Sequence, residues 1–348
     1  MLGMGHAGRP KHGSSEGNRN DNLGLIQYLV SIGRRTRMPK TNLVNDMLGK
    51  GTSRRTFLKA GGAAALAMTG LTTGARAEAS RPLVYAFAAW SDALAITYVG
   101  AKLIEDNFGY KVQPLQAEPG VIYASLQSGK ADLYSNSYMQ GMGPLKGDYQ
   151  GGQADYVKKV ADFIKVVGVS EGPMTQGLAV PEYVDIKSIA ELNDQADKFP
   201  GGIIGIDAGS GLMQAADATV KAYSLKLHLV PGSQAAMEAA FRRAYSRNEA
   251  IVVTTWEPLP MWSKFKMRYL EDPKRTMMAE PYYCFHVMTK DFETNFPKAQ
   301  AFLTKFRIPN DELAKIMGWI DGGMKPEDAA AKWIGEMKGK GMIEPWLA

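Results

Sequence analysis

The sequence contains few of the residue types that carry metal or redox chemistry in proteins. Cys284 is its one cysteine, and four histidines are spread over 348 residues. A single cysteine excludes an intramolecular disulfide, and no CxxC pair is present. Only His228 and His286 lie beyond residue 77, and two isolated histidines do not make a histidine metal site. The sequence therefore predicts neither a metal nor a cofactor.

An excess of positive charge is also missing from most of the chain. The net charge is +6, but residues 1–77 hold 12 of the 41 Lys and Arg and only 3 of the 35 Asp and Glu. Residues 78–348 therefore carry 29 basic and 32 acidic side chains. A slightly acidic domain lacks the basic surface that nucleic-acid binding requires, so we expect no nucleic acid among its partners.

An export signal is the first feature that is present. The string SRRTFLK (residues 53–59) is followed by a weakly apolar stretch at 60–73 and by the small-x-small site ARA at 75–77. This pattern resembles a twin-arginine signal peptide. The apolar stretch is shorter than the ~20 residues of a membrane-spanning helix, which favours a cleaved signal over an anchor. We expect export by the twin-arginine translocase, cleavage near Ala77 and a periplasmic location.

The stretch that precedes this signal, residues 1–46, is unusually long. The stretch GHAGRPKHGSSEGNRNDN (5–22) is polar and Gly-rich and has no apolar period, which is typical of disorder. Export signals normally begin close to their arginines, and a start at Met47 gives an ordinary length. We therefore interpret 1–46 as a disordered stretch from an over-extended start site and 47–77 as the signal peptide.

Beyond residue 81, segments typical of strands alternate with segments of helical period. RPLVYAF (81–87) is typical of a strand, and SDALAITYVGAKLIEDNFGY (91–110) has apolar residues at helical spacing. Further along the chain, GGIIGIDAGSGLMQ (201–214) contains a strand, a Gly-rich turn and the start of a helix. The C-terminal part, from residue 296, has the pattern of consecutive helices. Such alternation predicts an α/β fold with parallel sheets.

Three aromatic side chains stand where a predicted strand ends. The β-branched run Ile251–Thr255 leads to Trp256 and stops before Pro258, and Trp90 and Tyr138 also follow predicted strands. Ligands of open α/β sheets bind outside the carboxyl ends of the strands. Core packing explains each ring alone, whereas three rings at strand ends favour contact with a ligand. The pattern leaves both interpretations open.

The Gly-rich turn GIDAGSGLMQ (205–214) leads into a predicted helix. It has no G-K-[ST] string and not the glycine spacing of a dinucleotide site. The free amides of Gly211 and Leu212 at a helix N-terminus can hold a small anion such as a carboxylate, or the segment is a tight turn only. Aromatic rings attract a quaternary ammonium group, so rings and amides together suit a zwitterion such as a betaine.

Four segments resemble the substrate-binding proteins of glycine betaine/proline (quaternary-ammonium) ABC transporters. They are GIDAGSGLMQAADATVKAYSL (205–225), GSQAAMEAAFRRAYSRNEAIVVTTWEP (232–258), RYLEDPKR (268–275) and MKPEDAAAKWI (324–334). The resemblance covers nearly all of residues 82–335, which makes it far more specific than a short motif.

The resemblance implies an α/β fold of the two-lobed periplasmic binding protein kind, a type II clamshell with two crossover hinges. The crossovers are expected near 172–178 and 282–286. Lobe 1 then comprises residues 82–171 together with 287–348, and lobe 2 comprises residues 172–286.

The resemblance also implies a ligand site and partners. In this family a box of aromatic rings holds the trimethylammonium group of the ligand, and backbone amides hold its carboxylate. Trp90, Tyr138 and Trp256 match ring positions, and Gly211 and Leu212 match the amides. The protein is then expected to bind a small zwitterionic or cationic osmolyte. It would pass that osmolyte to an ABC permease and its ATPase in the inner membrane.

Two residues that matter for the ligand depart from the pattern of the family. Ser210 stands where some relatives have a box tryptophan, and Leu259 stands where many have a histidine that helps to bind the carboxylate. With one ring and one donor fewer, trimethylamine N-oxide, choline or carnitine is an alternative to glycine betaine. Glu257 either offers a negative charge to the ligand or is a solvated loop acid.

A twin-arginine-exported enzyme is the alternative class, because that route often carries folded cofactor proteins. The sequence has no nucleophile elbow or phosphate loop, and neither histidine of the mature chain lies in a catalytic motif. We therefore predict a binding protein that has no catalytic activity.

Overall fold

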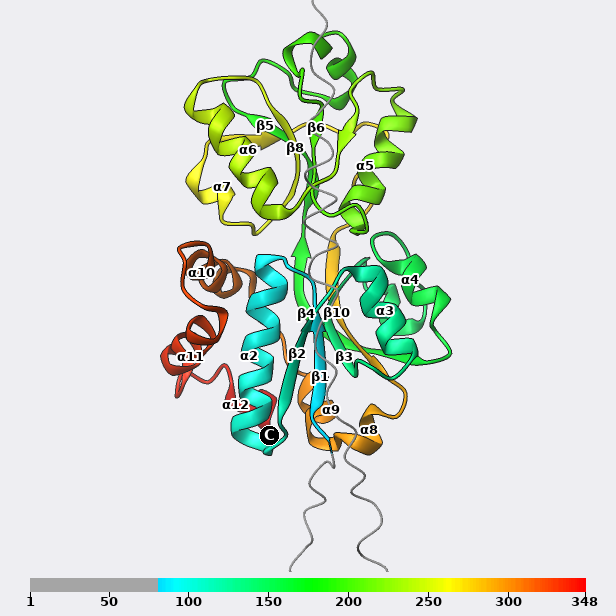
Figure 1. Cartoon of the computed structure of the whole chain (residues 1–348), viewed down its shortest axis with the longest axis vertical. Helices are drawn as coiled ribbons and strands as arrows, with labels where there is room; N and C mark the ends of the chain where they lie inside the picture. The colour runs from blue at the N-terminus through cyan, green and yellow to red at the C-terminus, as the bar shows by residue number, and fades with distance from the viewer. Residues whose placement is uncertain (1–80) are drawn as a thin grey trace, which may run out of the picture. The chain divides into compact units, whose positions relative to one another are not determined.

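The structure, a computed structural model, describes residues 81–348 (Figure 1). The expected signal peptide at 47–77 and the expected disordered stretch at 1–46 lie outside the described residues. Within 81–348, no helix combines the length and the apolar character that crossing a membrane requires.

The first lobe is built on a five-stranded sheet with the order β2-β1-β3-β10-β4. Its strands are β1 (Leu83–Phe87), β2 (Val112–Gln116), β3 (Leu133–Gln140), β4 (Ile164–Met174) and β10 (Tyr282–Thr289). β1 runs parallel to β2 and β3, whereas β10 runs antiparallel to β3 and β4.

Helices cover both faces of this sheet. They are α2 (Ser91–Phe108), α3 (Pro119–Gln127), α4 (Ala154–Lys159), α8 (Phe292–Asn295), α9 (Pro297–Leu303), α10 (Asn310–Asp321), α11 (Pro326–Met337) and α12 (Glu344–Leu347). The helices α10 and α11 pack on α2, and α3 packs on α4 (Figure 1). The segments α8 to α12 follow β10, so the C-terminal helices belong to the first lobe.

The second lobe is built on a sheet with the order β7-β6-β8-β5-β9. Its strands are β5 (Gln176–Pro181), β6 (Ile203–Ile204), β7 (Leu229–Val230), β8 (Val252–Trp256) and β9 (Met267–Tyr269), and its helices are α5 (Gly211–Ala222), α6 (Gln234–Ser246) and α7 (Met261–Lys264). β6 runs parallel to β7 and β8, and β5 runs antiparallel to β8 and β9.

Both sheets are therefore mixed: the expected parallel pairs are present, but antiparallel pairs, which the sequence did not predict, stand beside them. The physical reason is the double crossover between the lobes. β4 leaves the first sheet and continues as β5 in the second, and β10 returns to the first sheet beside β4. Strands that carry the chain out of a lobe and back into it lie antiparallel to their neighbours.

The crossovers lie in short segments between strands of different sheets. Pairing of β4 with β10 continues as far as Met174 and Tyr282, so the expected lobe limits at 171/172 and 286/287 fall inside these two strands. We propose to place the limits at Thr175 and in the segment between Tyr269 and Tyr282 instead.

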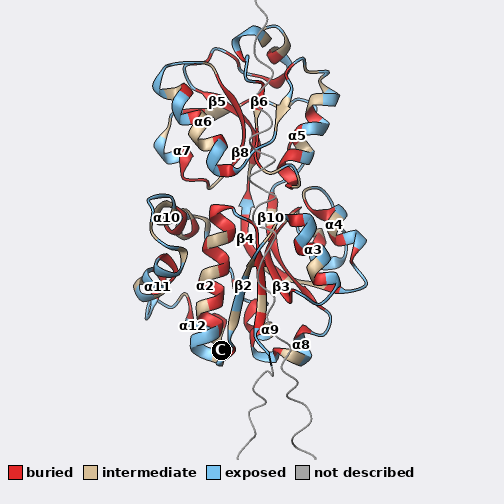
Figure 2. Cartoon of the chain, viewed as in Figure 1, coloured by how far each residue is buried: buried red, intermediate tan, exposed pale blue. Residues whose placement is uncertain are grey.

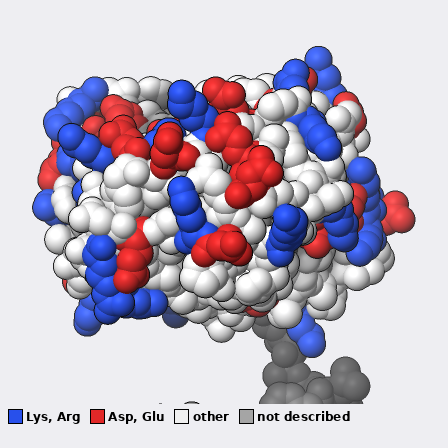
Figure 3. Space-filling view, turned by 90° about the horizontal axis from the view of Figure 1, so that it is seen from above, with Lys and Arg blue, Asp and Glu red and all other residues white. Residues whose placement is uncertain are grey.

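Buried residues follow the strands and the inner faces of the helices in both lobes (Figure 2). The core includes two tryptophans of the C-terminal helices. Trp333 is fully buried, and it stacks on Trp346 with 6.4 Å between the ring centroids. Basic and acidic side chains are interspersed on the face shown in Figure 3, as the near balance of charges beyond residue 77 leads one to expect.

Candidate functional site

A cleft between the two lobes contains all five residues that the sequence suggested as a site. The space between its atoms is about 290 Å³, which includes the part open to solvent. Its lining residues are Trp90, Tyr138, Gln176, Ile206, Gly211, Leu212 and Trp256. None of them carries a full charge, so the cleft offers ring faces, amides and aliphatic surface to a ligand.

Trp90 and Tyr138 come from the first lobe. Trp90 follows β1 and is the N-cap residue of α2, and Tyr138 lies near the end of β3. Their ring centroids are 6.1 Å apart with an interplanar angle of 74°, an edge-to-face arrangement that aromatic pairs favour. Trp90 is only 3% exposed. The two rings therefore form a rigid wall of the cleft.

Trp256 comes from the second lobe, at the last position of β8. Its ring is buried, and its indole Nε1 has no hydrogen-bond partner in the protein. Buried indole N–H groups usually donate to an acceptor. A ligand oxygen or a water molecule in the cleft is therefore needed to satisfy this donor.

Gln176 and Ile206 also line the cleft, and sequence reasoning missed both. Gln176 is the first residue of β5 and pairs directly with Trp256 across the sheet. Its side chain therefore lies close to the Trp256 ring. Ile206 follows β6, in the turn before α5. No local pattern marks either residue, because their place depends on strand pairing between distant segments.

The N-terminus of α5 supplies backbone amides at the cleft. The hydroxyl of Ser210 accepts a hydrogen bond from the amide of Met213 at 3.2 Å, and the amide of Gln214 donates to the carbonyl of Ser210 at 3.1 Å. These bonds leave Gly211 and Leu212 as the first-turn amides without an intrahelical partner. Ser210 is thus a helix cap and does not line the cleft.

Leu259, the other departure from the family pattern, and the nearby Glu257 also lie outside the cleft lining. Leu259 is 1% exposed and packs in the turn after β8. The carboxylate of Glu257 accepts a hydrogen bond from the Thr175 hydroxyl at 2.8 Å, and the Glu257 amide donates to the Thr175 carbonyl at 2.9 Å. Glu257 therefore ties the β8 turn to the first crossover instead of facing the ligand cleft.

A cluster of fully buried polar groups lies next to Tyr138. The Asn136 amide nitrogen donates to Asp92 at 3.0 Å and to Glu171 at 2.6 Å, and it lies 3.4 Å from the sulfur of Cys284. The hydroxyl of Tyr138 donates to Asp92. One oxygen of Asp92 and one of Glu171 have no partner. The cluster therefore connects a ring of the cleft to strands β4 and β10, which cross between the lobes.

Burial raises the pKa of both carboxyl groups in this cluster, and the charge of Asp92 raises the pKa of Glu171 further. Donor atoms of Asp92, Glu171 and Cys284 lie within 4.8 Å of one another. A metal ion among them would have to displace the Asn136 amide group, which already contacts all three residues. Protonation of one of the two carboxyl groups fits this arrangement better, because two buried like charges cannot both persist there.

We expect Glu171→Gln to stabilise the ligand-free protein at pH 8. A carboxyl group whose folded-state pKa is raised contributes stability below its unfolded pKa and loses that contribution as the pH rises through the folded value. Glutamine removes this loss, and its side-chain oxygen can still accept the hydrogen bond from Asn136. The free energy of unfolding should rise by about 1–3 kcal/mol, measured by calorimetry at pH 5 and pH 8.

Glu293, an exposed glutamate that pairs with Lys165 at 3.2 Å, provides the control. Glu293→Gln should change the melting temperature little at either pH, because exposed ion pairs contribute little. A Glu171→Gln protein that is less stable than the wild type at pH 8 would show that Glu171 is needed as a charge.

Comparison with known proteins places this chain among transport proteins. The family described as the substrate binding domain of ABC-type glycine betaine transport system matches residues 81–336. The glycine betaine/carnitine transport binding protein GbuC of Listeria monocytogenes is 35% identical over 145 residues. That stretch is 40% of this chain and 48% of GbuC, so the match spans about half the length of this curated relative.

Solved structures show the same two-lobed fold. Lactococcal OpuAC, in its closed-liganded conformation complexed with glycine betaine, is 26% identical, with a TM-score of 0.68 over 77% of this chain and 100% of its own. The glycine betaine/L-proline-binding protein ProX of Borrelia burgdorferi is 25% identical, with a TM-score of 0.69 over 77% and 97%. These matches confirm the expected type II periplasmic binding protein fold, and the chain belongs to the family of substrate-binding domains of ABC-type glycine betaine transport systems.

Proposed function

We propose that this protein is the periplasmic substrate-binding component of an ABC importer for glycine betaine or a related quaternary-ammonium osmolyte. The observation that carries the proposal is the convergence of Trp90, Tyr138 and Trp256 on one cleft between the lobes. Two of these rings come from the first lobe and one from the second, so a ligand held by all three joins the lobes.

The cleft suits a cationic head in chemical terms. Ring faces attract a quaternary ammonium by about 0.5–2 kcal/mol for each well-placed ring. No lysine, arginine or histidine belongs to its lining, so nothing there repels a cation. The amides of Gly211 and Leu212 and the free indole N–H of Trp256 are available for the oxygen atoms of the ligand.

Choline, carnitine and trimethylamine N-oxide are the alternative ligands. Leu259 replaces a histidine that helps many relatives to bind a carboxylate, and it is buried away from the cleft. The relative GbuC is named for glycine betaine and carnitine, which supports keeping carnitine among the candidates. None of these ligands requires the protein to perform chemistry.

The proposal includes export and transfer of the ligand. The SRRTFLK string at 53–59 supports export by the twin-arginine translocase, with cleavage near Ala77. In the periplasm, the closed protein would deliver its osmolyte to the permease and ATPase of the importer.

A ligand screen tests the proposed function. We expect glycine betaine or one of the three alternatives to raise the melting temperature and to bind in calorimetry. At a hundredfold excess over Kd, the added stability is about 2.7 kcal/mol. The control ligands are 3,3-dimethylbutanoate and 3,3-dimethylbutanol, in which a neutral tert-butyl group replaces trimethylammonium. Equal binding of these isosteres, or no binding of any quaternary ammonium compound, would contradict the proposal.

A further inference from the structure

Hydrogen bonds join the two lobes beside the aromatic box, and one of them has a charged acceptor. The indole Nε1 of Trp90 donates to Oδ2 of Asp207 at 2.7 Å. The neighbouring bonds involve neutral groups: Ser91 and Gln234 exchange two bonds of 3.0 and 2.9 Å, and the Tyr156 hydroxyl donates to the Gly209 carbonyl at 3.2 Å. A hydrogen bond to a carboxylate is roughly twice as strong as a neutral one.

Asp207 is held in place by its own turn. It lies between β6 and α5, and its carbonyl accepts a bond from the Ser210 amide at 2.9 Å. The same turn leads into Gly211 and Leu212, the amides at the cleft. The position of the Asp207 carboxylate is therefore set within the second lobe, whereas its partner Trp90 belongs to the first.

Trp90 is held firmly at its backbone. Its amide donates to the Ala88 carbonyl at 2.8 Å, and its carbonyl accepts from the Leu94 amide at 2.9 Å. On the ring itself, Tyr138 packs edge-to-face against Trp90. The indole N–H is the polar edge of the ring, and Asp207 is the group that it contacts. The orientation of the ring therefore depends on a residue of the opposite lobe.

Charge attraction does not explain why Asp207 lies here. Within residues 81–348, no lysine or arginine forms an ion pair with Asp207. The nearby acid Glu118, at the N-cap of α3 in the first lobe, has a pKa that is raised by burial and then by the charge of Asp207. A charged Glu118 repels Asp207, so the indole N–H is then the favourable contact at this point. A protonated Glu118 can instead donate a second hydrogen bond to Asp207 across the lobes.

We propose that Asp207 is a positioning residue that acts through Trp90 and links closure of the lobes to assembly of the aromatic box. When the lobes close, the carboxylate meets the indole N–H and fixes the Trp90 ring against the ligand. When they open, this bond breaks and the ring loses its anchor. Asp207 thereby slows release of the ligand, although it does not line the cleft. The inference rests on the proposed function for its ligand.

The test is a double-mutant cycle on the full-length mature protein. The probe is the quaternary ammonium compound that the wild type binds in the screen. Asp207→Ala should increase the dissociation rate about 10- to 100-fold, because bonds to charged groups are worth this much, and should leave the association rate nearly unchanged. Asp207→Asn keeps a hydrogen-bond acceptor and should increase the dissociation rate less than Asp207→Ala does. In a Trp90→Phe background, which has no indole N–H, Asp207→Ala should increase the dissociation rate by less than about 2-fold. The contact that the two residues share is already absent there.

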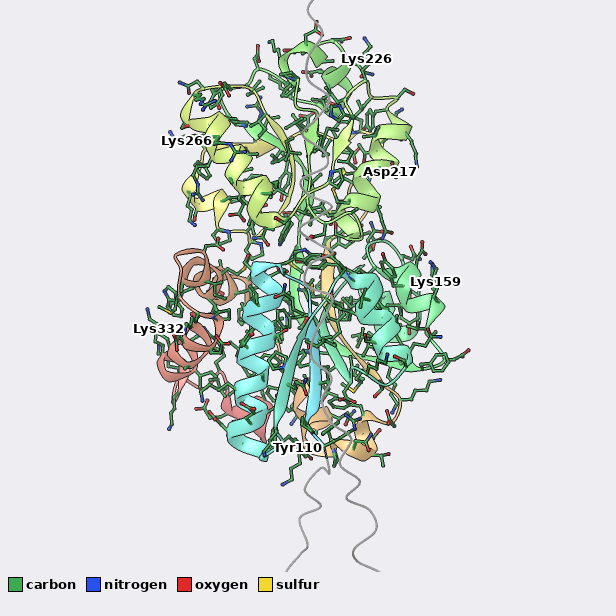
Figure 4. The ribbon with its side chains drawn as sticks, viewed as in Figure 1. Tyr110, Lys159, Asp217, Lys226, Lys266 and Lys332 are labelled. Carbon is green, nitrogen blue, oxygen red and sulfur yellow. The ribbon has the colours of Figure 1, made fainter. Side chains whose placement is uncertain are left out.

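Asp217, an exposed acid on the outer side of α5 (Figure 4), is the matched control. Asp217→Ala should leave both rates unchanged. The melting temperature of the ligand-free Asp207→Ala protein should stay close to that of the wild type, because the contact is made only in the closed fraction of the ligand-free molecules. Equal dissociation rates for Asp207→Ala and the wild type, or full additivity with Trp90→Phe, would overturn the proposal.

Failure of the proposed function would be visible separately. A wild type that binds none of the quaternary ammonium probes contradicts that function alone. Single-molecule FRET between the lobes of the ligand-free protein then tests whether the contact between Asp207 and Trp90 favours closure. Asp207→Ala must lower the closed fraction, and an unchanged fraction overturns the proposal.

Discussion

Replacing Gly211 with alanine is expected to weaken ligand binding about 5- to 100-fold, the range that overpacking of 1–3 kcal/mol produces. An added Cβ would lie 2.5 Å from the Cα atom of Gly152, in the first lobe. Gly152 is itself closely packed, because a Cβ added to it would lie 2.3 Å from the carbonyl oxygen of Tyr138. Alanine at position 211 should therefore hold the lobes apart.

The stability of the ligand-free protein separates this effect from misfolding. Gly211 has no left-handed backbone and begins α5, so alanine fits the helix itself. The melting temperature without ligand should stay at the wild-type value or rise, while calorimetry shows the loss of affinity. Gly209→Ala is the matched control, because its Cβ would meet the Tyr156 hydroxyl at an ordinary 3.5 Å. Wild-type affinity in Gly211→Ala would mean that the ligand is bound without this close approach.

Replacing Trp256 with alanine should weaken binding by about 1–3 kcal/mol, through lost cation–π attraction and lost contact area. Phenylalanine at this position keeps a ring face and should retain part of the affinity. Leucine is similarly apolar but has no ring, and it should retain less. This order distinguishes an aromatic box from a pocket that is merely hydrophobic.

Calorimetric titration of the three variants gives the order directly. Trp319→Ala provides the control, because this half-buried tryptophan lies on α10 beneath the ammonium group of Lys332, at 4.0 Å from its ring centroid, and away from the cleft lining. Its loss should leave the affinity unchanged. If Trp256→Leu binds as well as Trp256→Phe, ring faces do not hold the ligand. A fall in the melting temperature without a change in affinity would instead assign Trp256 to core packing.

The sequence by itself predicted the elements that present the site. Local signals were sufficient: a β-branched run that ends at Trp256, a Gly-rich turn before α5 and helical spacing after Trp90 are all readable within a few residues. The rule that ligands lie at the carboxyl ends of strands then indicated Trp90, Tyr138 and Trp256 together. The structure brings these three rings to one cleft, and their role in binding remains a prediction.

Only the tertiary structure decided which distant residues meet. Gln176 reaches the cleft because β5 pairs with β8, and Asp207 meets Trp90 because the lobes close on each other over a separation of 117 residues. The buried carboxyl groups of Asp92 and Glu171 come together because α2 begins beside the crossover strands. The physical reason is range: periodicity and capping act between near neighbours in the sequence. Strand order, register and closure depend instead on contacts between segments far apart, which no local pattern encodes.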